Sequence, residues 1–265
     1  MRSALVLIVA AALLPAGAAR AATAHDDASD PAYDDGFQDG DDGGSGFGTG
    51  WTFTTNNDPG GLTKFGLGSS TVNGDGDSNG DGDIDTGGRA WRLAAHGVAQ
   101  AELYRSFSGP LAVGDAFSFD LDTEAIPPPF GFSSFELLTG ANIAFDFRRS
   151  GNDPDYEYSD GDQFFLDTGI PADDEGVHVA LAPTSSTTYR LRVTALATGV
   201  TAVIDGAFFT AGMPDWFRFG VQADDTTTSR ILFVNAVTVP EPSARDEQLL
   251  AAPALLALSL RRRRG

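Results

Sequence analysis

The chain has 265 residues, of which 37 are Asp or Glu, 17 are Lys or Arg and none is Cys. A net charge of −20 repels phosphate backbones and anionic lipid headgroups, which excludes nucleic acid as an expected partner and favours divalent cations. A chain without cysteine relies on its core, or on bound metal, because it forms no disulfides. The length suits one all-β domain between two terminal segments.

The N-terminus has the features of a signal peptide. Met1 and Arg2 form a short basic start, residues 4–14 are an unbroken apolar run, and Ala19-Arg20-Ala21 is a small-x-small cleavage site, with residues 22–24 as a second option. The apolar run is shorter than the ~20 residues that span a bilayer. The sequence therefore predicts a removable signal helix over residues 1–21 and export of the protein.

Residues 22–50 form an acidic segment that is rich in Gly and Asp. It also contains aromatic residues such as Tyr33 and Phe37, which are unusual for a plain disordered linker. We expect irregular loops here that lead into a first strand near Trp51, so that residues 51–239 form the folded domain.

From Ala90 onward, short runs rich in β-branched and aromatic residues alternate with Gly, Pro, Asp and Asn, which is typical of strands and turns. Side chains alternate within several runs, so one strand face is expected in the core and the other in water. The clearest runs are residues 91–94, 101–107, 116–122, 142–148, 164–166, 177–182, 189–196, 202–209, 216–222 and 230–239. Strands without intervening helices cannot make a parallel sheet, so the prediction is an all-β fold of two packed antiparallel sheets, a jelly-roll (concanavalin A-like) sandwich.

An Asp-rich loop at residues 73–88 has the pattern of a calcium site. Acidic or amide residues recur at alternate positions, with Gly82 at the sharp turn and Ile84 after it. The candidate ligands are Asp77, Asn79, Asp81, Asp83 and Asp85. Position 12, where a bidentate Glu closes such loops, is Gly88, and the loop resembles those of dockerin and thrombospondin type 3 repeats incompletely. The alternative is a solvated loop of Asx turns without metal.

Two carboxylate pairs, Asp120 with Asp122 and Asp155 with Glu157, alternate as the acid pairs of glycan-cleaving enzymes do. Neither pair lies in the E-x-D-x-x-E arrangement of laminarinase-like hydrolases, and an Asp-rich chain contains such pairs by chance. We therefore expect no catalytic residues.

Some aromatic residues are candidates for contact with a sugar ring, and others are expected in the core. Tyr156 and Tyr158 fall on one face of a polar strand and are the best candidates for stacking on a sugar ring. Core packing is the expected role of Trp51, Trp91 and Trp216. The histidines show no spacing that indicates zinc or a nucleophile–base pair.

The C-terminal segment 240–265 contains three elements in a fixed order: Pro240-Glu241-Pro242, an apolar tract over residues 249–260, and the basic end Arg261, Arg262, Arg263 and Arg264. This order resembles the PEP-CTERM sorting signal of Gram-negative bacteria, which implies processing by an exosortase-type enzyme, often in species that make exopolysaccharide. The apolar tract predicts a short hydrophobic helix, with transient membrane contact and the arginines held on the cytoplasmic side. The segment 244–248, which inserts charge between motif and tract, and Pro253 within the tract depart from the pattern.

The domain also resembles one that recurs in such exported proteins. The similarity spans residues 33–239, with landmarks at residues 43–48, 85–91, 105–107 and 173–177. It implies a lectin-like or laminin-G-like sandwich at the cell surface, and it implies no activity or site residues.

Two functional interpretations follow from these features. The first is an exported, non-catalytic protein of the cell surface or extracellular matrix, possessing a calcium loop and associated with exopolysaccharide. The alternative is a secreted carbohydrate-binding module or a glycan-active hydrolase on a jelly-roll fold, which requires a sheet face with aromatic side chains and close carboxylates.

Overall fold

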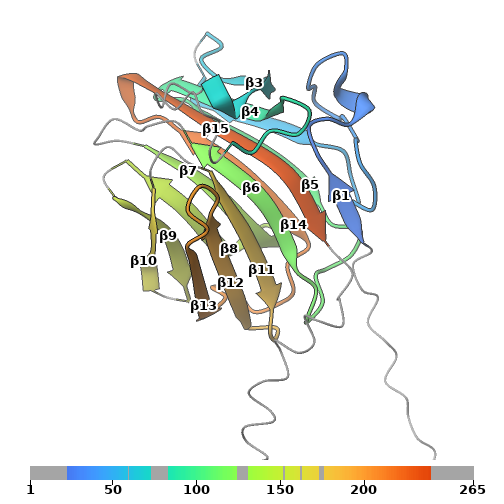
Figure 1. The fold of residues 1–265 in the computed structure, drawn as a ribbon, viewed down its shortest axis with the longest axis vertical. Helices are drawn as coiled ribbons and strands as arrows, with labels where there is room; N and C mark the ends of the chain where they lie inside the picture. The colour runs from blue at the N-terminus through green and yellow to red at the C-terminus, as the bar shows by residue number, and fades with distance from the viewer. Residues whose placement is uncertain are drawn as a thin grey trace, which may run out of the picture.

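The computed structural model describes residues 23–58, 60–72, 83–123, 131–151, 153–161, 163–172 and 176–239. These residues form two antiparallel sheets that pack face to face, with two short 3-10 helices, η1 (Pro31–Tyr33) and η2 (Ser70–Val72) (Figure 1). The predicted all-β fold of two antiparallel sheets is confirmed. The expected signal helix and C-terminal hydrophobic helix lie outside the described residues.

The first sheet has eight strands in the order β13-β12-β11-β6-β15-β4-β3, and β1 pairs with β15 beside this series. Its strands are β1 (Ala24–Asp26), β3 (Lys64–Gly68), β4 (Ala90–Gly97), β6 (Phe117–Thr123), β11 (Val177–Pro183), β12 (Thr188–Ala195), β13 (Thr201–Ala207) and β15 (Asp225–Val239). The central strand β15 is the longest, and it joins the N-terminal strand to the rest of the domain.

The second sheet has seven strands in the order β10-β9-β8-β7-β14-β5-β2. Its strands are β2 (Thr52–Asn56), β5 (Gln100–Ser106), β7 (Phe132–Thr139), β8 (Asn142–Ser150), β9 (Asp155–Asp160), β10 (Gln163–Pro171) and β14 (Trp216–Gln222). Every pairing in both sheets is antiparallel.

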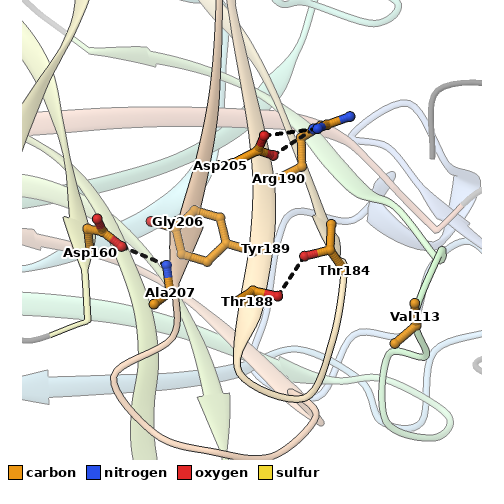
Figure 2. A pocket seen from close by; sticks show the side chains of 9 residues that line it. All are labelled: Val113, Asp160, Thr184, Thr188, Tyr189, Arg190, Asp205, Gly206 and Ala207. Atoms are coloured by element: carbon orange, nitrogen blue, oxygen red, sulfur yellow. Dashed lines mark hydrogen bonds and ion pairs between the residues drawn. The ribbon is translucent and has the colours of Figure 1, made fainter. Parts of the chain in front are cut away.

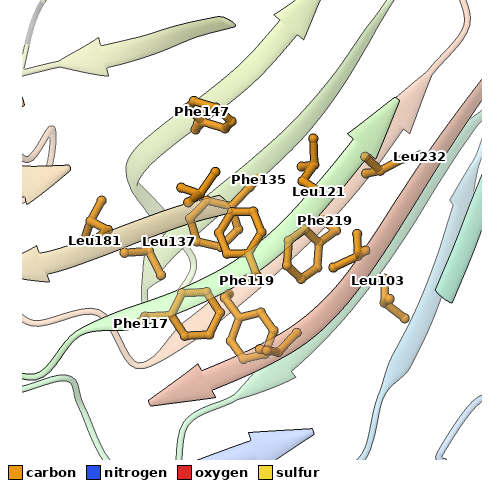
Figure 3. Packing of buried hydrophobic residues seen from close by; sticks show 14 of the residues in the cluster. Leu103, Phe117, Phe119, Leu121, Phe135, Leu137, Phe147, Leu181, Phe219 and Leu232 are labelled. Atoms are coloured by element: carbon orange, nitrogen blue, oxygen red, sulfur yellow. The ribbon is translucent and has the colours of Figure 1, made fainter. Parts of the chain in front are cut away.

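Aromatic side chains make up much of the core between the two sheets. Phe119 and Phe135, from opposite sheets, have centroids 4.3 Å apart, and Phe219 lies 5.0 Å from Phe119 (Figure 3). Trp51 and Trp91, both without exposed surface, extend this cluster with a centroid distance of 5.0 Å. Each buried ring removes a large apolar area from water, so the aromatic core stabilises a chain that has no cysteine for disulfides.

The acidic segment before residue 51 is part of the sandwich. Instead of irregular loops alone, residues 24–26 pair with residues 237–239 of β15. Tyr33 and Phe37 are buried, and both rings contact Trp91 edge-on or tilted. The aromatic residues of this segment are therefore core residues, which explains their presence in an otherwise polar stretch.

Candidate functional site

The outer face of the seven-stranded sheet carries two rows of mostly charged residues that cross its strands. Along β7, β8 and β14 the residues of these rows alternate with Phe135, Phe147 and Phe219. Because these phenylalanines point into the core, the residues of the two rows point outward. Directly opposed residues on β8, β7, β14 and β5 form the first row: Asp146, Glu136, Arg218 and Tyr104. The second row, which starts on β9, is Glu157, Arg148, Ser134, Gly220 and Glu102. We call these two rows the charged ladder.

Arg218 is the central cation of the charged ladder. Its Nη1 donates to Glu102 Oε1 at 2.8 Å and to the Tyr104 hydroxyl oxygen at 2.9 Å, and its Nη2 donates to Glu136. The Tyr104 hydroxyl donates to Glu102 Oε2 at 2.6 Å. Burial raises the pKa of Glu136, although the Arg218 charge opposes the shift. Both glutamates are thus held by one guanidinium and are little exposed.

Glu157 is engaged in a similar way on the other side of the charged ladder. It accepts hydrogen bonds from Arg148 Nε at 3.2 Å and from the Ser150 hydroxyl. The Arg148 guanidinium also lies over the ring of Phe165 on β10. Phe165 has a φ of 48°, a conformation that is uncommon for an aromatic residue and that often marks a functional position.

Asp146 ends the first row and differs from the other carboxylates. Its Oδ1 is buried and has no hydrogen-bond partner in the described part of the chain. Burial raises the pKa of Asp146 to about 7, and the neighbouring Glu136 charge contributes in the same direction. At neutral pH this carboxyl therefore exists partly in the protonated form, which can donate a hydrogen bond.

Asp146 lines a pocket of about 840 Å³. The pocket forms where β9 leaves β8, since these strands pair only at two positions and the Phe209 N–H instead donates to the Ala144 carbonyl at 2.9 Å. The lining is mainly apolar and aromatic: Ile143, Asp146, Gly161, Phe165, Thr187, Thr188, Ala207, Phe208 and Phe209. We call this the aromatic pocket.

A second pocket of about 750 Å³ shares Thr188 and Ala207 with the aromatic pocket (Figure 2). Its polar side chains already have hydrogen-bond partners. Asp160 Oδ1 accepts from the Ala207 N–H at 2.6 Å, and Arg190 Nε donates to Asp205 Oδ1 at 2.7 Å. None of the described residues that line this second pocket has a buried polar side-chain atom without a partner, whereas Asp146 in the aromatic pocket does. The aromatic pocket is therefore the better candidate site.

The expected calcium loop is described only in part. Asp77, Asn79 and Asp81 lie outside the described residues. Asp85 accepts from the Ser70 N–H at 2.9 Å, and Asp83 Oδ2 accepts from the Thr71 hydroxyl at 3.0 Å. Within the described ranges, no three His, Cys, Asp or Glu side chains are grouped as metal ligands.

The stacking role expected for Tyr156 is wrong. Tyr156 has no exposed surface and stacks on Phe147 inside the sandwich, with ring centroids 5.3 Å apart. Of the two carboxylate pairs, Glu157 belongs to the charged ladder, whereas Asp120 lies on the other sheet, 2.6 Å from His178 Nδ1. The sorting residues Pro240, Glu241, Pro242 and Arg261–Arg264 lie outside the described residues.

Sequence reasoning missed Asp146 and Arg218, although a signal for both exists. Each is a charged residue between two phenylalanines, in Phe145-Asp146-Phe147 and Phe217-Arg218-Phe219. That alternation places each charge on the outer face of a strand, but it does not show that the two residues share a row.

The described residues contain no helix that is long and apolar enough to cross a membrane.

No protein family and no curated protein matches the sequence. Among solved structures, the chain is similar to a carbohydrate esterase from the Shiga toxin-encoding bacteriophage phi24B, at 14% identity over 73% of this chain and 91% of that one, with a TM-score of 0.45. It is also similar to a legume lectin-like domain from Entamoeba histolytica, at 7% identity over 61% and 88% of the two chains, with a TM-score of 0.43. A β-1,3-1,4-glucanase from a mouse hindgut metagenome is 12% identical over 56% and 78%, with a TM-score of 0.41. At these values the similarities say nothing about the activity of this chain.

Proposed function

We propose that the chain is an exported, non-catalytic β-sandwich protein that binds a glycan in the aromatic pocket. The observation that carries the proposal is the Asp146 carboxyl, which has an oxygen without a partner among the described residues and lines a pocket walled by three phenylalanines. Sugar rings present apolar C–H faces that pack on aromatic rings, and hydroxyls that accept or donate hydrogen bonds. A partly protonated carboxyl among rings serves both requirements.

Localisation and partners are proposed from the two termini. The signal peptide and the PEP-CTERM-like tail support export from a Gram-negative bacterium and processing by an exosortase-type enzyme. An acidic, glycan-binding domain at the cell surface or in the matrix would meet exopolysaccharide as its natural ligand. Calcium bound at residues 77–85 remains part of this proposal as a structural cofactor.

A hydrolase is the second candidate, and the raised pKa of Asp146 is the observation that favours it. Glycan hydrolysis needs a general acid together with a second carboxylate that acts as nucleophile or base. The neighbouring carboxylate, Glu136, is 6% exposed and paired with Arg218, so it is poorly placed to reach a substrate. For this reason we favour binding over catalysis.

A polysaccharide panel tests the proposal on the purified chain. We expect retention on at least one bacterial polysaccharide without release of reducing sugar. Phe165→Ala and Asp146→Ala should weaken retention about tenfold or more, the range expected when a buried contact of 1.4 kcal/mol or above is removed. Asp146→Asn should keep retention because the amide still donates a hydrogen bond.

Asp120→Asn is the matched control, because it removes one negative charge from the outer face of the other sheet. It should leave retention unchanged. Release of reducing sugar that disappears in Asp146→Asn would replace the binding proposal by the hydrolase. Retention that is insensitive to both pocket variants would place the glycan elsewhere on the molecule.

A further inference from the structure

Two arginines point into the space between the sheets at one end of the sandwich. Arg149 continues the inward series of Phe145 and Phe147 on β8 and is 8% exposed. Arg230 precedes Leu232 in the inward series of β15 and is 1% exposed. Positions that normally hold apolar side chains therefore hold two cations, and both are largely removed from water.

Contacts place the two arginines close together. Arg149 Nη1 donates to the Thr123 hydroxyl at 2.7 Å, and Thr123 ends β6, the strand that pairs with β15. Ser133 lies opposite Arg149 on β7. Two residues before Ser133, a Cβ on Gly131 would lie 2.8 Å from Arg230 Nε. One end of the interlayer space thus contains two guanidinium groups and two hydroxyls, all from described residues.

The Arg230 side chain makes no hydrogen bond to any residue that the structure describes. None of its three nitrogens has a partner in the described chain, and the buried Ser133 hydroxyl has none either. Burial, together with the nearby Arg149 charge, lowers the pKa of Arg230 to about 10, so the group is still a cation at neutral pH. The charge of the exposed Asp224 opposes that shift. A buried cation without a partner is unfavourable unless an anion or other acceptor meets it.

We propose that this end of the interlayer space is a binding site for a small oxyanion, held by Arg230 and Arg149 with the Ser133 hydroxyl. Guanidinium groups bind sulfate, phosphate and carboxylate oxygens through paired N–H donors. The site is separate from the aromatic pocket, which none of these residues lines. Because the overall field of a chain of net charge −20 repels anions, an oxyanion would bind only where local donors such as these hold it.

The test is thermal unfolding and calorimetric titration of the full chain, with sodium sulfate and sodium glucuronate as separate probes and sodium chloride at matched ionic strength as reference. Sulfate represents a free oxyanion and glucuronate the carboxylate of an acidic sugar. We expect one probe to bind with one-to-one stoichiometry. Above its Kd, each tenfold rise in that probe should raise Tm by about 3–5 °C.

Arg230→Met should abolish the probe-dependent rise and should itself raise Tm in buffer without oxyanion, because an apolar side chain replaces an unpaired cation. Arg190→Gln is the matched control, since Arg190 is paired with Asp205 on the surface, and it should keep the rise. An equal rise in all three proteins would show general salt exclusion and overturn the proposal. Two other results would also overturn the proposal: no binding of either probe by calorimetry, or a Tm of Arg230→Met below that of the wild type without oxyanion. The calorimetric titration uses the wild-type chain, so it does not require the variant to fold.

Discussion

At the scale of single residues, Asp26 shows how an acidic chain uses its carboxylates inside the core. Asp26 has no exposed surface and accepts hydrogen bonds from the Tyr33 hydroxyl at 2.6 Å, from Trp51 Nε1 at 3.1 Å and from Arg105. Arg105 in turn donates to the Thr49 carbonyl at 2.8 Å. Burial raises the pKa of Asp26 to about 6 against these donors. One carboxylate therefore joins β1, η1, β5 and Trp51, the residue that precedes β2.

Asp26→Asn tests this buried pair. Removal of Asp26 leaves the buried Arg105 charge with only the exposed Asp42 as a counterion, so the free energy of unfolding should fall by about 3 kcal/mol in urea titrations. Asp205→Asn breaks the surface pair with Arg190, and its cost should be about 0–1 kcal/mol. Equal losses in the two variants would contradict the role assigned to Asp26.

The raised pKa of Asp146 predicts a pH dependence of stability. A carboxyl whose pKa is near 3.8 in the unfolded chain and about 7 in the folded one contributes stability that is fully present below pH 4 and lost as pH rises through 7. Asp146→Asn should flatten this part of the profile and exceed the wild type at pH 8 by on the order of 2 kcal/mol. Asp35→Asn, on an exposed acid, should reproduce the wild-type profile; a profile unchanged by Asp146→Asn would refute the assignment.

At the scale of elements, the N-terminal strand depends on the glycine-rich segment that runs beside it. His25 exchanges two backbone hydrogen bonds with Ser45, of 2.9 and 2.8 Å. Gly44 has a φ of 69°, and a Cβ at this position would lie 2.0 Å from the His25 carbonyl oxygen. The landmark at residues 43–48 is therefore a packing requirement, because only glycine permits this approach to β1.

Gly44→Ala should displace β1 and its partner segment. We expect a stability loss of about 2–3 kcal/mol, with faster hydrogen exchange at the amides of His25 and Ser45. Gly36→Ala is the control, because Gly36 also has a positive φ, of 107°, but no atom within 4 Å of the added Cβ. It should cost only the backbone strain, about 1 kcal/mol, and leave those amides protected.

The strand pattern was predictable where inward residues are strongly apolar. Phe117, Phe119 and Leu121 alternate with polar residues, and β6 lies where the alternation places it. The sequence pattern does not predict strand β7, because Ser133, Ser134 and Glu136 make this stretch polar. In the structure these three residues are nevertheless buried. Their burial depends on neighbours in β8 and β14, which local periodicity does not reveal.

The charged ladder was unpredictable for a related reason. Glu136 and Asp146 become neighbours through the β7–β8 hairpin, but Arg218 joins them from β14, 82 residues after Glu136. Strand order and register decide such a row, and neither is encoded in the spacing of the charged residues. The proposed calcium loop is the opposite case, because its candidate ligands alternate within residues 77–85 and sequence pattern alone is enough to propose them.

At the scale of the whole molecule, the net charge of −20 determines how the fold responds to cations. Self-repulsion among the acids destabilises the compact state, and any salt relieves it by screening. A specific calcium site would add a further stabilisation that saturates and that sodium or magnesium at equal ionic strength does not reproduce. Cation identity therefore separates a built site from a solubilising acidic surface.

The full chain should melt at a higher temperature in millimolar CaCl2 than in MgCl2 of equal ionic strength, by about 2–4 °C if the gain is near 1 kcal/mol. Asp81→Ala should remove this difference, because it deletes an oxygen ligand at position 5 of the loop. Asp35→Ala removes the same charge from an exposed position and should preserve the difference. Identical melting in the two salts would mean that the loop binds no calcium and that its acids act only through the overall field.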